Sequence, residues 1–397
     1  MNSRTAVVLA AGEGRRLRPL TKHRPKPMLP AANRPILEYV LDAVIDAGFD
    51  DLHLVVGYRR DRVQSHFGAT YRNRTLTYHA QEKQLGSGHA LLQARDDVDG
   101  EFVVVNGDEV VTSDTVADVA GAHEIGDAAA IAVVESNRAP EYGAVRVEDD
   151  LVTELVEKPQ SGTYRLLNAG VYALDESIFA RLEATSSGGD ELALTASVAD
   201  AIDEGQRVRA VRSDDLWVDT TYPWDLPTLA EELLSVGLVD EPETDHGAFV
   251  DDAATVHPDA TLRAPVVIGP DATVGPAAVV GPHVAVGRNA SVAAGAVIDR
   301  TVVDADARVG PNATVIDSVV GQAARVGPGV TIPGGAADVR VGNAIHEDVR
   351  LGAVLADRSE LRGGATVTPG ALVGPDATVA VGSHVAGTVP EGAEVVN

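Results

Sequence analysis

The chain lacks cysteine and is almost without lysine. The absence of cysteine in 397 residues excludes disulfide bonds, thiolate metal sites and cysteine nucleophiles. No apolar run reaches the roughly 18 residues that cross a bilayer, and the first apolar run is too short for a secretory signal, so we expect a cytoplasmic protein. Only 4 of the 32 basic residues are lysine. A lysine retained in such a chain is expected where the chemistry needs a compact ammonium group.

Basic residues are also far fewer than acidic residues in the chain as a whole. The formal net charge is −27, and the acidic residues are spread along the whole chain. Such a chain would be repelled by phosphate backbones, so nucleic acid is not expected as a partner. Abundant acid with little lysine is typical of proteins that work in high salt, where self-repulsion is screened. We therefore predict a halophilic, haloarchaeal source, with an unusually acidic mesophilic protein as the alternative.

The stretch AVVLAAGEGRRLRPLTKHRPKPMLP, near the N-terminus, combines three features of a phosphate site. Residues 6–11 are continuously apolar, as in a strand covered on both faces. Gly12 and Gly14 follow and let backbone N–H groups approach a ligand. Several cations come next, namely Arg15, Arg16, Arg18, Lys22 and Lys26. The stretch therefore favours polyphosphate binding, with a tight strand-to-helix turn as the alternative. It matches neither GxxxxGK[ST] nor GxGxxG.

Strand and helix patterns alternate over the next hundred residues. Helical spacing predicts a helix over 35–48, and apolar runs predict strands over 52–56, 76–79, 101–105 and 128–134. This alternation predicts a parallel α/β sheet with helices on both faces. Ligands of such sheets bind beyond the carboxyl ends of the strands. Gly12, Gly57 and Asp108 all lie at such ends.

A six-residue repeat replaces this pattern after the polar segment VDEPETDHG. An aliphatic residue recurs every six positions from Val250 to Ile298 and, after two slips of one residue, as far as Ile332. The frame returns from Leu355 to Val385 after an irregular stretch. Three hexapeptides make one triangular coil, and stacked coils bury the repeated aliphatics, so we predict a β-helix of roughly eight coils. The predicted organisation is a first domain over 1–237, a linker over 238–248 and a repeat domain over 249–397.

Both parts of the chain resemble a known family. GEGRRLRPLTKHRPKPMLP resembles the signature of the sugar-1-phosphate nucleotidylyltransferases, G-x-G-x-R-L-x-P-L-T followed by P-K and then P. The hexapeptides resemble the left-handed parallel β-helix of the family's two-domain members. The resemblance, which covers most of residues 5–235, implies a Rossmann-like domain followed by that β-helix. Arg15 departs from the signature, and we expect it to be a solvated charge.

The resemblance also implies roles for individual residues. Arg16 and Lys26 would be catalytic and hold the nucleotide's phosphates, and Asp108 and Asp219 would bind Mg²⁺, although an aspartate placed like Asp108 can equally cap a helix. The segment QEKQLGSGHA resembles the uridine-reading loop of UDP-N-acetylglucosamine pyrophosphorylases. The implied nucleotide-binding residues are Leu9, Ala11, Gly12, Gly14, Gln81, Gly86 and Ser87. The implied sugar-phosphate-binding residues are Asp108, Gly143, Glu157, Lys158 and Asn168, with a solvated Glu157–Lys158 pair as the alternative.

The leading hypothesis is a Mg²⁺-dependent enzyme that joins N-acetylglucosamine-1-phosphate or glucose-1-phosphate to UTP or dTTP and releases pyrophosphate. Relatives with acetyltransferase activity use a histidine near a tyrosine, together with lysines. Beyond Tyr222 this chain has no further tyrosine and no lysine, and His346 is the one plausible catalytic histidine. A bifunctional enzyme is therefore the first alternative, and a non-catalytic regulatory subunit is the second. We expect the repeat domain to form a homo-oligomer, with a trimer favoured.

Overall fold

The computed structural model describes residues 4–136, 142–157, 159, 164–185 and 191–396. Its contacts form two compact units. The first unit comprises Met1–Glu13, Pro25–Met28 and Ile36–Asp219. The second unit comprises Gly14–Arg24, Leu29–Pro35 and Thr220–Asn397. Part of the signature stretch thus groups with the repeats by its contacts, while the boundaries at 237 and 248 stay a prediction about sequence domains.

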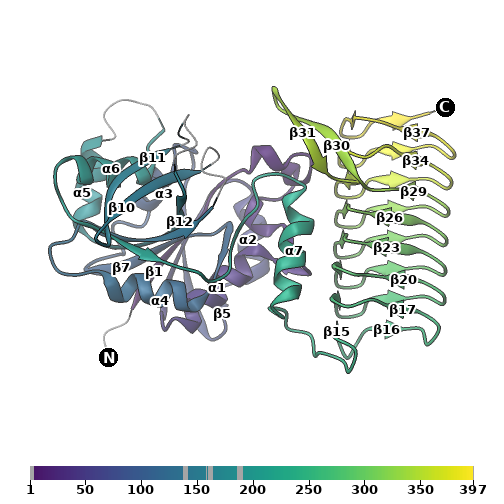
Figure 1. Ribbon diagram of the computed structural model, residues 1–397, viewed down its shortest axis with the longest axis horizontal. Coiled ribbons are helices and arrows are strands. Elements are labelled where there is room, and N and C mark those ends of the chain that lie inside the picture. Colours follow the sequence, from purple (N-terminus) through teal and green to yellow (C-terminus); the bar gives the residue numbers. More distant parts are fainter. Residues whose placement is uncertain (1–3, 137–141, 158, 160–163, 186–190, 397) are drawn as a thin grey trace. The chain divides into compact units, whose positions relative to one another are not determined.

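The first unit contains a ten-stranded sheet with the order β10-β11-β13-β9-β12-β7-β1-β4-β6-β5 (Figure 1). The parallel pairing predicted for the first hundred residues is confirmed, because β1 pairs in parallel with β4 and β7, and β4 with β6. The whole sheet is mixed, since β12 runs antiparallel to both β7 and β9. The strands are β1 (Thr5–Ala10), β4 (Asp51–Val56), β5 (Thr70–Tyr71), β6 (Arg74–Ala80), β7 (Glu101–Asn106), β9 (Ala129–Glu135), β10 (Gly143–Glu148), β11 (Leu151–Glu157), β12 (Leu166–Asp175) and β13 (Val208–Arg212).

Helices cover both faces of this sheet, as predicted. Along β1, Val8 belongs to the apolar cluster that contains α1 and α4, whereas Val7 belongs to the opposite cluster with α3, α5 and α6. Each face of the strand is therefore buried, which explains its uninterrupted apolar sequence. The helices are α1 (Ile36–Asp46), α2 (Arg60–Phe67), α3 (Ser87–Leu92), α4 (Ser113–Ala122), α5 (Ser177–Thr185) and α6 (Leu194–Asp203). The 3-10 helix η3 (Lys26–Met28) also belongs to this unit.

The repeat region of the second unit is a parallel β-helix, which confirms the six-residue pattern (Figure 1). Its first sheet has eight strands, β15 (Ala248–Val250), β18 (Val266–Ile268), β21 (Val284–Val286), β24 (Val302–Val303), β27 (Val319–Val320), β32 (Ala353–Leu355), β35 (Ala371–Val373) and β38 (Thr388–Val389). The second also has eight, β16 (Thr255–Val256), β19 (Thr273–Val274), β22 (Ser291–Val292), β25 (Arg308–Val309), β28 (Arg325–Val326), β33 (Glu360–Leu361), β36 (Thr378–Val379) and β39 (Glu394–Val395). The third has seven, β17 (Thr261–Leu262), β20 (Val279–Val280), β23 (Val297–Asp299), β26 (Thr314–Ile316), β29 (Thr331–Ile332), β34 (Thr366–Val367) and β37 (His384–Val385).

The repeated aliphatic residues form the core of the β-helix. Ile268, Val286 and Val303 pair in register on successive coils, and all three are fully buried. The irregular stretch between the repeats is an antiparallel hairpin of β30 (Ala336–Val341) and β31 (Ala344–Arg350). An inserted hairpin leaves the stack intact, because β27 pairs directly with β32 across it.

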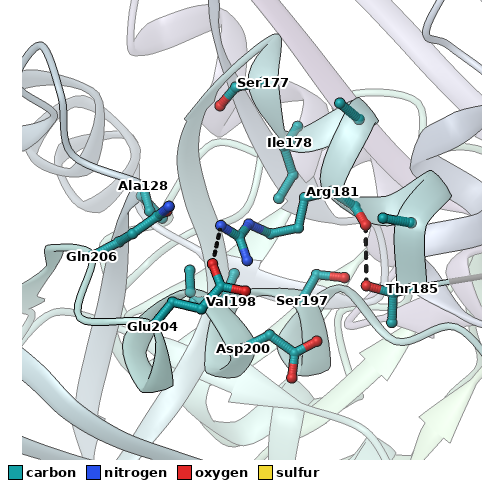
Figure 2. Close-up of a pocket in the computed structure, with 14 residues that line it drawn as sticks. Ala128, Ser177, Ile178, Arg181, Thr185, Ser197, Val198, Asp200, Glu204 and Gln206 are labelled. Atoms are coloured by element: carbon teal, nitrogen blue, oxygen red, sulfur yellow. Dashed lines mark hydrogen bonds and ion pairs between the residues drawn. The ribbon is translucent and has the colours of Figure 1, made fainter.

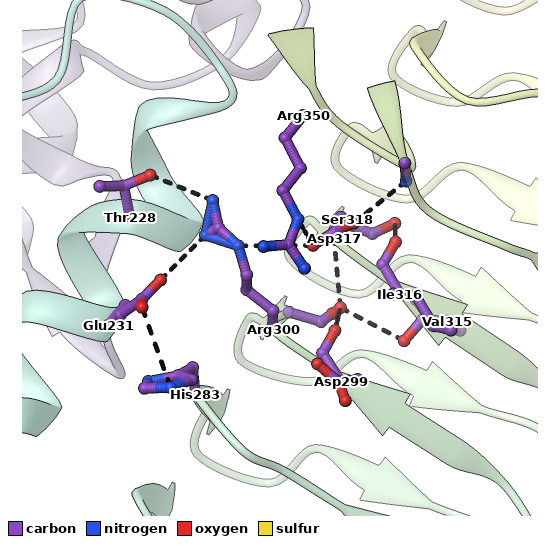
Figure 3. Close-up of polar contacts among 12 residues, drawn as sticks. Thr228, Glu231, His283, Asp299, Arg300, Val315, Ile316, Asp317, Ser318 and Arg350 are labelled. Carbon is purple, nitrogen blue, oxygen red and sulfur yellow. Dashed lines mark hydrogen bonds and ion pairs between the residues drawn. The ribbon is translucent and has the colours of Figure 1, made fainter. Parts of the chain in front are cut away.

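Helix α7 (Asp225–Ser235) is attached to the β-helix by ionic contacts (Figure 3). Arg300 lies 3.1 Å from Glu231 on α7 and also donates to Thr228. On its other side Arg300 faces Asp317, which is shared with Arg350 of β31. The remaining elements of this unit are η1 (Arg15–Leu17), η2 (Leu20–Lys22), β2 (Pro30–Ala31) and β3 (Arg34–Pro35). Within the described ranges, no helix is long and apolar enough to cross a membrane.

Candidate active site

A two-stranded ladder brings the predicted metal-binding aspartates together. In the first unit, β8 (Glu109–Val111) pairs with β14 (Trp217–Asp219), which sets Asp219 opposite Glu109 and next to Asp108. The Lys26 ammonium lies 2.7 Å from Asp108 Oδ2 and 2.7 Å from Asp219 Oδ1. Burial opposes the charge on Lys26, but the two carboxylates prevail and raise its pKa above the ordinary lysine value. Two oxygens from distant segments therefore converge on one cation.

Glu109 lies in the candidate site, and sequence reasoning missed it. It is partly buried beside the aspartates, and its carboxyl accepts hydrogen bonds from Asn106 at 2.7 Å and from the Trp217 indole at 3.0 Å. Burial, followed by the charges of Asp219 and Asp108, raises the pKa of Glu109 to about 8. The two hydrogen bonds tie this carboxyl into the ladder beside the aspartates. The only sequence signal was a second acidic residue directly after Asp108.

Three of the predicted sugar-phosphate residues lie together on neighbouring strands. Gly143 pairs with Glu157 across β10 and β11. A Cβ atom placed on Gly143 would lie 3.4 Å from Glu157 Oε1 and 3.8 Å from Asn168 Cβ. Glu157 accepts a hydrogen bond from Thr195 at 2.8 Å. Lys158 lies outside the described residues.

Gly170 joins this group to the carboxylate cluster. Its φ of +68° is in the left-handed region, and an added Cβ would lie 2.5 Å from Asn106 Nδ2 and 2.6 Å from Glu109 Oε2. Asn168, two residues earlier, donates to the Tyr172 hydroxyl at 2.5 Å. The two groups of residues therefore form one continuous site, and any side chain at position 170 would push apart the residues that connect them.

Backbone atoms at the end of β1 hold the neighbouring loops. The carbonyl of Leu9 accepts from Gly107 N at 2.9 Å, and that of Ala11 accepts from Tyr58 N at 3.2 Å and Gln84 Nε2 at 3.3 Å. Gly12, which comes next, has open space where a Cβ would stand. The predicted nucleotide-binding residues of β1 therefore border an open position. Their contacts with a nucleotide stay a prediction.

The predicted base-reading side chains have structural contacts of their own. Gln81 is buried, and its amide donates to the carbonyl of Gly86 at 3.0 Å. The Ser87 hydroxyl accepts from the backbone N–H of Leu194, the first residue of α6, at 2.9 Å. These bonds tie the loop to the start of that helix. Base recognition by Gln81, Gly86 and Ser87 stays a prediction.

Gly14 and Arg16 belong to the second unit, in a segment that we name the signature loop, Gly14–Arg24. Gly14 has a φ of +65°, and its carbonyl accepts from Leu17 N at 3.0 Å and from the Thr21 hydroxyl at 2.8 Å. Leu17 and Thr21 are buried, whereas Arg16 is exposed. The loop therefore has a fixed internal fold that leaves the Arg16 guanidinium accessible to an anion.

A separate cavity of about 450 Å³ lies beside α5 and α6 and contains none of the predicted site residues (Figure 2). Arg181 reaches across it to pair with Glu204 at 2.8 Å, and Thr185 donates to the backbone carbonyl of Arg181. Small side chains such as Ala128 and Ser197 line the rest. The residues with predicted site roles lie elsewhere.

Comparison with known proteins covers both units. The nucleotidyl transferase family matches residues 5–235, which is more than half of the chain. A second family, described as the GMPPB C-terminal domain, matches residues 262–357. Among solved structures, a UDP-glucose pyrophosphorylase complexed with UDP-glucose aligns over 59% of this chain and all of its own, with a TM-score of 0.53 and 21% identity. That likeness shows the fold.

Curated relatives are similar over the N-terminal part. The bifunctional protein GlmU of Methanocaldococcus jannaschii is 35% identical over 224 residues, which are 56% of this chain and 52% of that protein. The UTP–glucose-1-phosphate uridylyltransferase AglF of Haloferax volcanii is 34% identical over 226 residues, which are 55% of this chain and 92% of that protein. The chain spans about half the length of the GlmU relatives that it matches.

Proposed function

Because this chain belongs to the nucleotidyl transferase family, we propose that it joins a sugar-1-phosphate to a nucleoside triphosphate and releases pyrophosphate. The observation that carries the proposal is the convergence of Asp108 and Asp219 on the Lys26 ammonium, at 2.7 Å each. It places a cation and two hard oxygen ligands beside the predicted sugar-phosphate residues, as phosphoryl chemistry requires. N-acetylglucosamine-1-phosphate or glucose-1-phosphate, with UTP or dTTP, are the proposed substrates.

The reaction needs little covalent help from the protein. The sugar-phosphate oxygen is already anionic at neutral pH, so no general base is required. It attacks the α-phosphorus of the triphosphate in line, a new P–O bond forms, and the bond to the β-phosphate breaks to release pyrophosphate. Arg16 and Lys26 would hold the triphosphate and the leaving group, and Glu157 would accept hydrogen bonds from sugar hydroxyls. Catalysis is then positioning and charge stabilisation.

The donor set fits a magnesium ion. Carboxylate oxygens are the protein ligands that Mg²⁺ prefers, and those of Asp108 and Asp219 lie close enough together for both to contact the Lys26 ammonium. Asp108 and Asp219 would hold the ion. When bound, it would neutralise charge on the reacting phosphates.

A pyrophosphate-release assay in high salt with Mg²⁺ tests the proposal. Four triphosphates (UTP, dTTP, GTP and ATP) are crossed with the 1-phosphates of glucose, N-acetylglucosamine, glucosamine and mannose. Release with one pair, lost in Asp108→Asn, supports the proposal and names the substrates. If folded protein releases no pyrophosphate with any pair, the proposed activity is ruled out and the regulatory subunit is favoured.

The acetyltransferase alternative has one structural point in its favour. The His346 ring on β31 lies 4.4 Å from the ring of Tyr222 and 5.2 Å from that of Trp224. A histidine and a tyrosine are thus neighbours, although the contact is ring packing. Acetyl transfer from acetyl-CoA to glucosamine-1-phosphate, measured in wild type and His346→Ala, decides this alternative. A homo-oligomer formed through the β-helix also stays a proposal.

A further inference from the structure

Four acidic residues line one corner of the β-helix. Each follows a strand of the first sheet within three residues, after β24, β32, β35 and β38 respectively. Because these strands belong to the same sheet, the residues after them lie along one edge of the stack. We name this edge the acidic corner, and it consists of Asp304, Asp357, Asp376 and Glu391.

The last residue of the signature loop is buried against this corner. The Arg24 guanidinium lies 2.6 Å from Asp304 Oδ2 and 3.0 Å from Asp357 Oδ1. Arg24 is 8% exposed, Asp304 9% and Asp357 3%. Gln322, on the coil between the two aspartates, donates its backbone N–H to Asp357 at 3.2 Å. One guanidinium therefore bridges two separate coils in a place that water barely reaches.

Two neighbouring cations follow the same edge with weaker contacts. Lys22 Nζ lies 2.7 Å from Glu391 Oε2, and His23 Nε2 lies 3.0 Å from Oε1 of the same residue. These groups are partly exposed, and exposed ion pairs contribute about 1 kcal/mol or less. A buried pair loses far more when one partner is removed. The signature loop is therefore attached to the β-helix mainly through the ion pairs of Arg24.

Hydrogen bonds within the signature loop connect the part near Arg24 to the part that carries Arg16. Its hydrogen bonds from Leu17 and Thr21 to the Gly14 carbonyl close the segment on itself. Arg16, the predicted phosphate ligand, lies inside the closed segment with its side chain exposed. Arg24 differs from Arg16 because both of its terminal nitrogens are engaged by aspartates.

We propose that the β-helix fixes the conformation of the signature loop through Arg24, and that Arg24 is a positioning residue for the phosphate contact of Arg16. The inference rests on the proposed function for the identity of the anion. It gives the repeat region a part in nucleotide binding beyond stacking and oligomerisation. Both acids come from the β-helix, which is remote in sequence from the signature. A substitution of either acid should therefore weaken binding of the nucleotide.

Two measurements on the full-length protein test this inference. The variants are Arg24→Gln and Asp357→Asn. The matched control is Asp306→Asn, because Asp306 lies on the same coil as Asp304 and its carboxylate accepts from Asn289 Nδ2 at 2.7 Å. Hydrogen exchange is followed over residues 14–22 and over the β-helix coils. Steady-state kinetics give KM separately for the triphosphate and for the sugar-1-phosphate.

In both test variants we expect exchange over residues 14–22 to become about tenfold faster while the coils keep their protection. The KM for the triphosphate should rise about tenfold, and that for the sugar-1-phosphate should stay within about twofold. Asp306→Asn should match wild type. Unchanged loop exchange, or equal changes in both KM values, would overturn the inference. If wild type releases no pyrophosphate with any pair, the proposed function fails, and the exchange data still decide whether the β-helix holds the loop.

Discussion

Lys26 and Arg24 stand two residues apart in the chain, and each is held by two aspartates. The Lys26 ammonium contacts Asp108 and Asp219 in the first unit, and the Arg24 guanidinium contacts Asp304 and Asp357 in the second. The charge balance is the same, with two carboxylates to one cation. The difference is access, because the Asp108 side chain is 33% exposed whereas those of Asp304 and Asp357 are 11% and 5% exposed.

Access determines what each arrangement can do. At Lys26, the partly exposed Asp108 leaves one side of the ion pair open to solvent. At Arg24, the guanidinium's planar fork spans two acids that water barely reaches, so the arrangement is suited to fixing structure. The comparison teaches that a buried cation between two aspartates is not by itself a sign of catalysis. The two arrangements differ in the solvent exposure of their aspartates, because Asp108 is partly exposed and Asp304 and Asp357 are not.

The largest expected effect is at the open site. Asp108→Asn removes one carboxylate from the pair facing Lys26, and we expect kcat for pyrophosphate release to fall about 10³-fold. The fold should persist, because Asp108 is partly solvated. Asp306→Asn on the β-helix is the matched control for the same chemical change. Activity within about threefold of wild type would remove Asp108 from the site.

The closed site should show the larger effect on stability. Arg24→Met leaves Asp304 and Asp357 buried without a counter-charge, and we expect the free energy of unfolding to fall by about 3–5 kcal/mol. Lys26→Met should cost less, because water can reach Asp108. Urea denaturation at constant high salt, followed by circular dichroism, compares the two variants. An equal loss in both would show that exposure does not separate the two arrangements.

Exchanging the two types of cation sharpens the comparison. Lys26→Arg puts a wide guanidinium where two oxygens converge on one point, and we expect kcat/KM to fall about 10²-fold. Arg24→Lys keeps the charge but cannot bridge both acids, so its effect should appear as a higher KM for the triphosphate. Steady-state kinetics on both variants provide the measurement. Full activity in Lys26→Arg would contradict the expectation that this lysine is retained for its compact ammonium.

Much of the first unit could be predicted because its signals are local. The uninterrupted apolar run of β1 indicates a strand buried on both faces, and the structure confirms this. Asp108 directly follows such a strand, while its link to Asp219 came from the family resemblance. The hexapeptide period was equally clear, because each coil repeats the same aliphatic position. The high-salt source stays a prediction from charge alone.

Other features depend on contacts that no local pattern records. The partners of Arg24 come from different coils on either side of the β30–β31 hairpin, so neither their spacing nor their order indicates that they meet. The raised pKa of Glu109 follows from burial beside Asp108 and Asp219, which only the folded ladder creates. Tyr222 was counted as lying before the repeats, yet the chain brings it against His346. Each of these features depends on a contact between residues far apart in sequence, which the sequence analysis did not predict.

The smallest expected effect concerns a buried pair that lacks a buried counter-charge. His53 Nδ1 lies 2.9 Å from His79 Nε2, and the nearest acids, Asp51 and Asp97, are largely in solvent. Burial, followed by the neighbouring His53, lowers the pKa of His79 below the ordinary 6.5. As the pH falls through 6.5 the unfolded chain takes up this proton first, so stability should decline until the pH passes the folded-state pKa.

His79→Gln keeps a hydrogen-bonding side chain at this position but removes the titratable imidazole. We expect it to flatten the decline in the free energy of unfolding as the pH falls below 6.5. Thermal unfolding at several pH values, in constant salt, measures the slope. His257→Gln, at an exposed position of the β-helix, makes the same chemical change and is the matched control. A variant slope equal to that of wild type would mean that His79 does not contribute to the acid sensitivity of the protein.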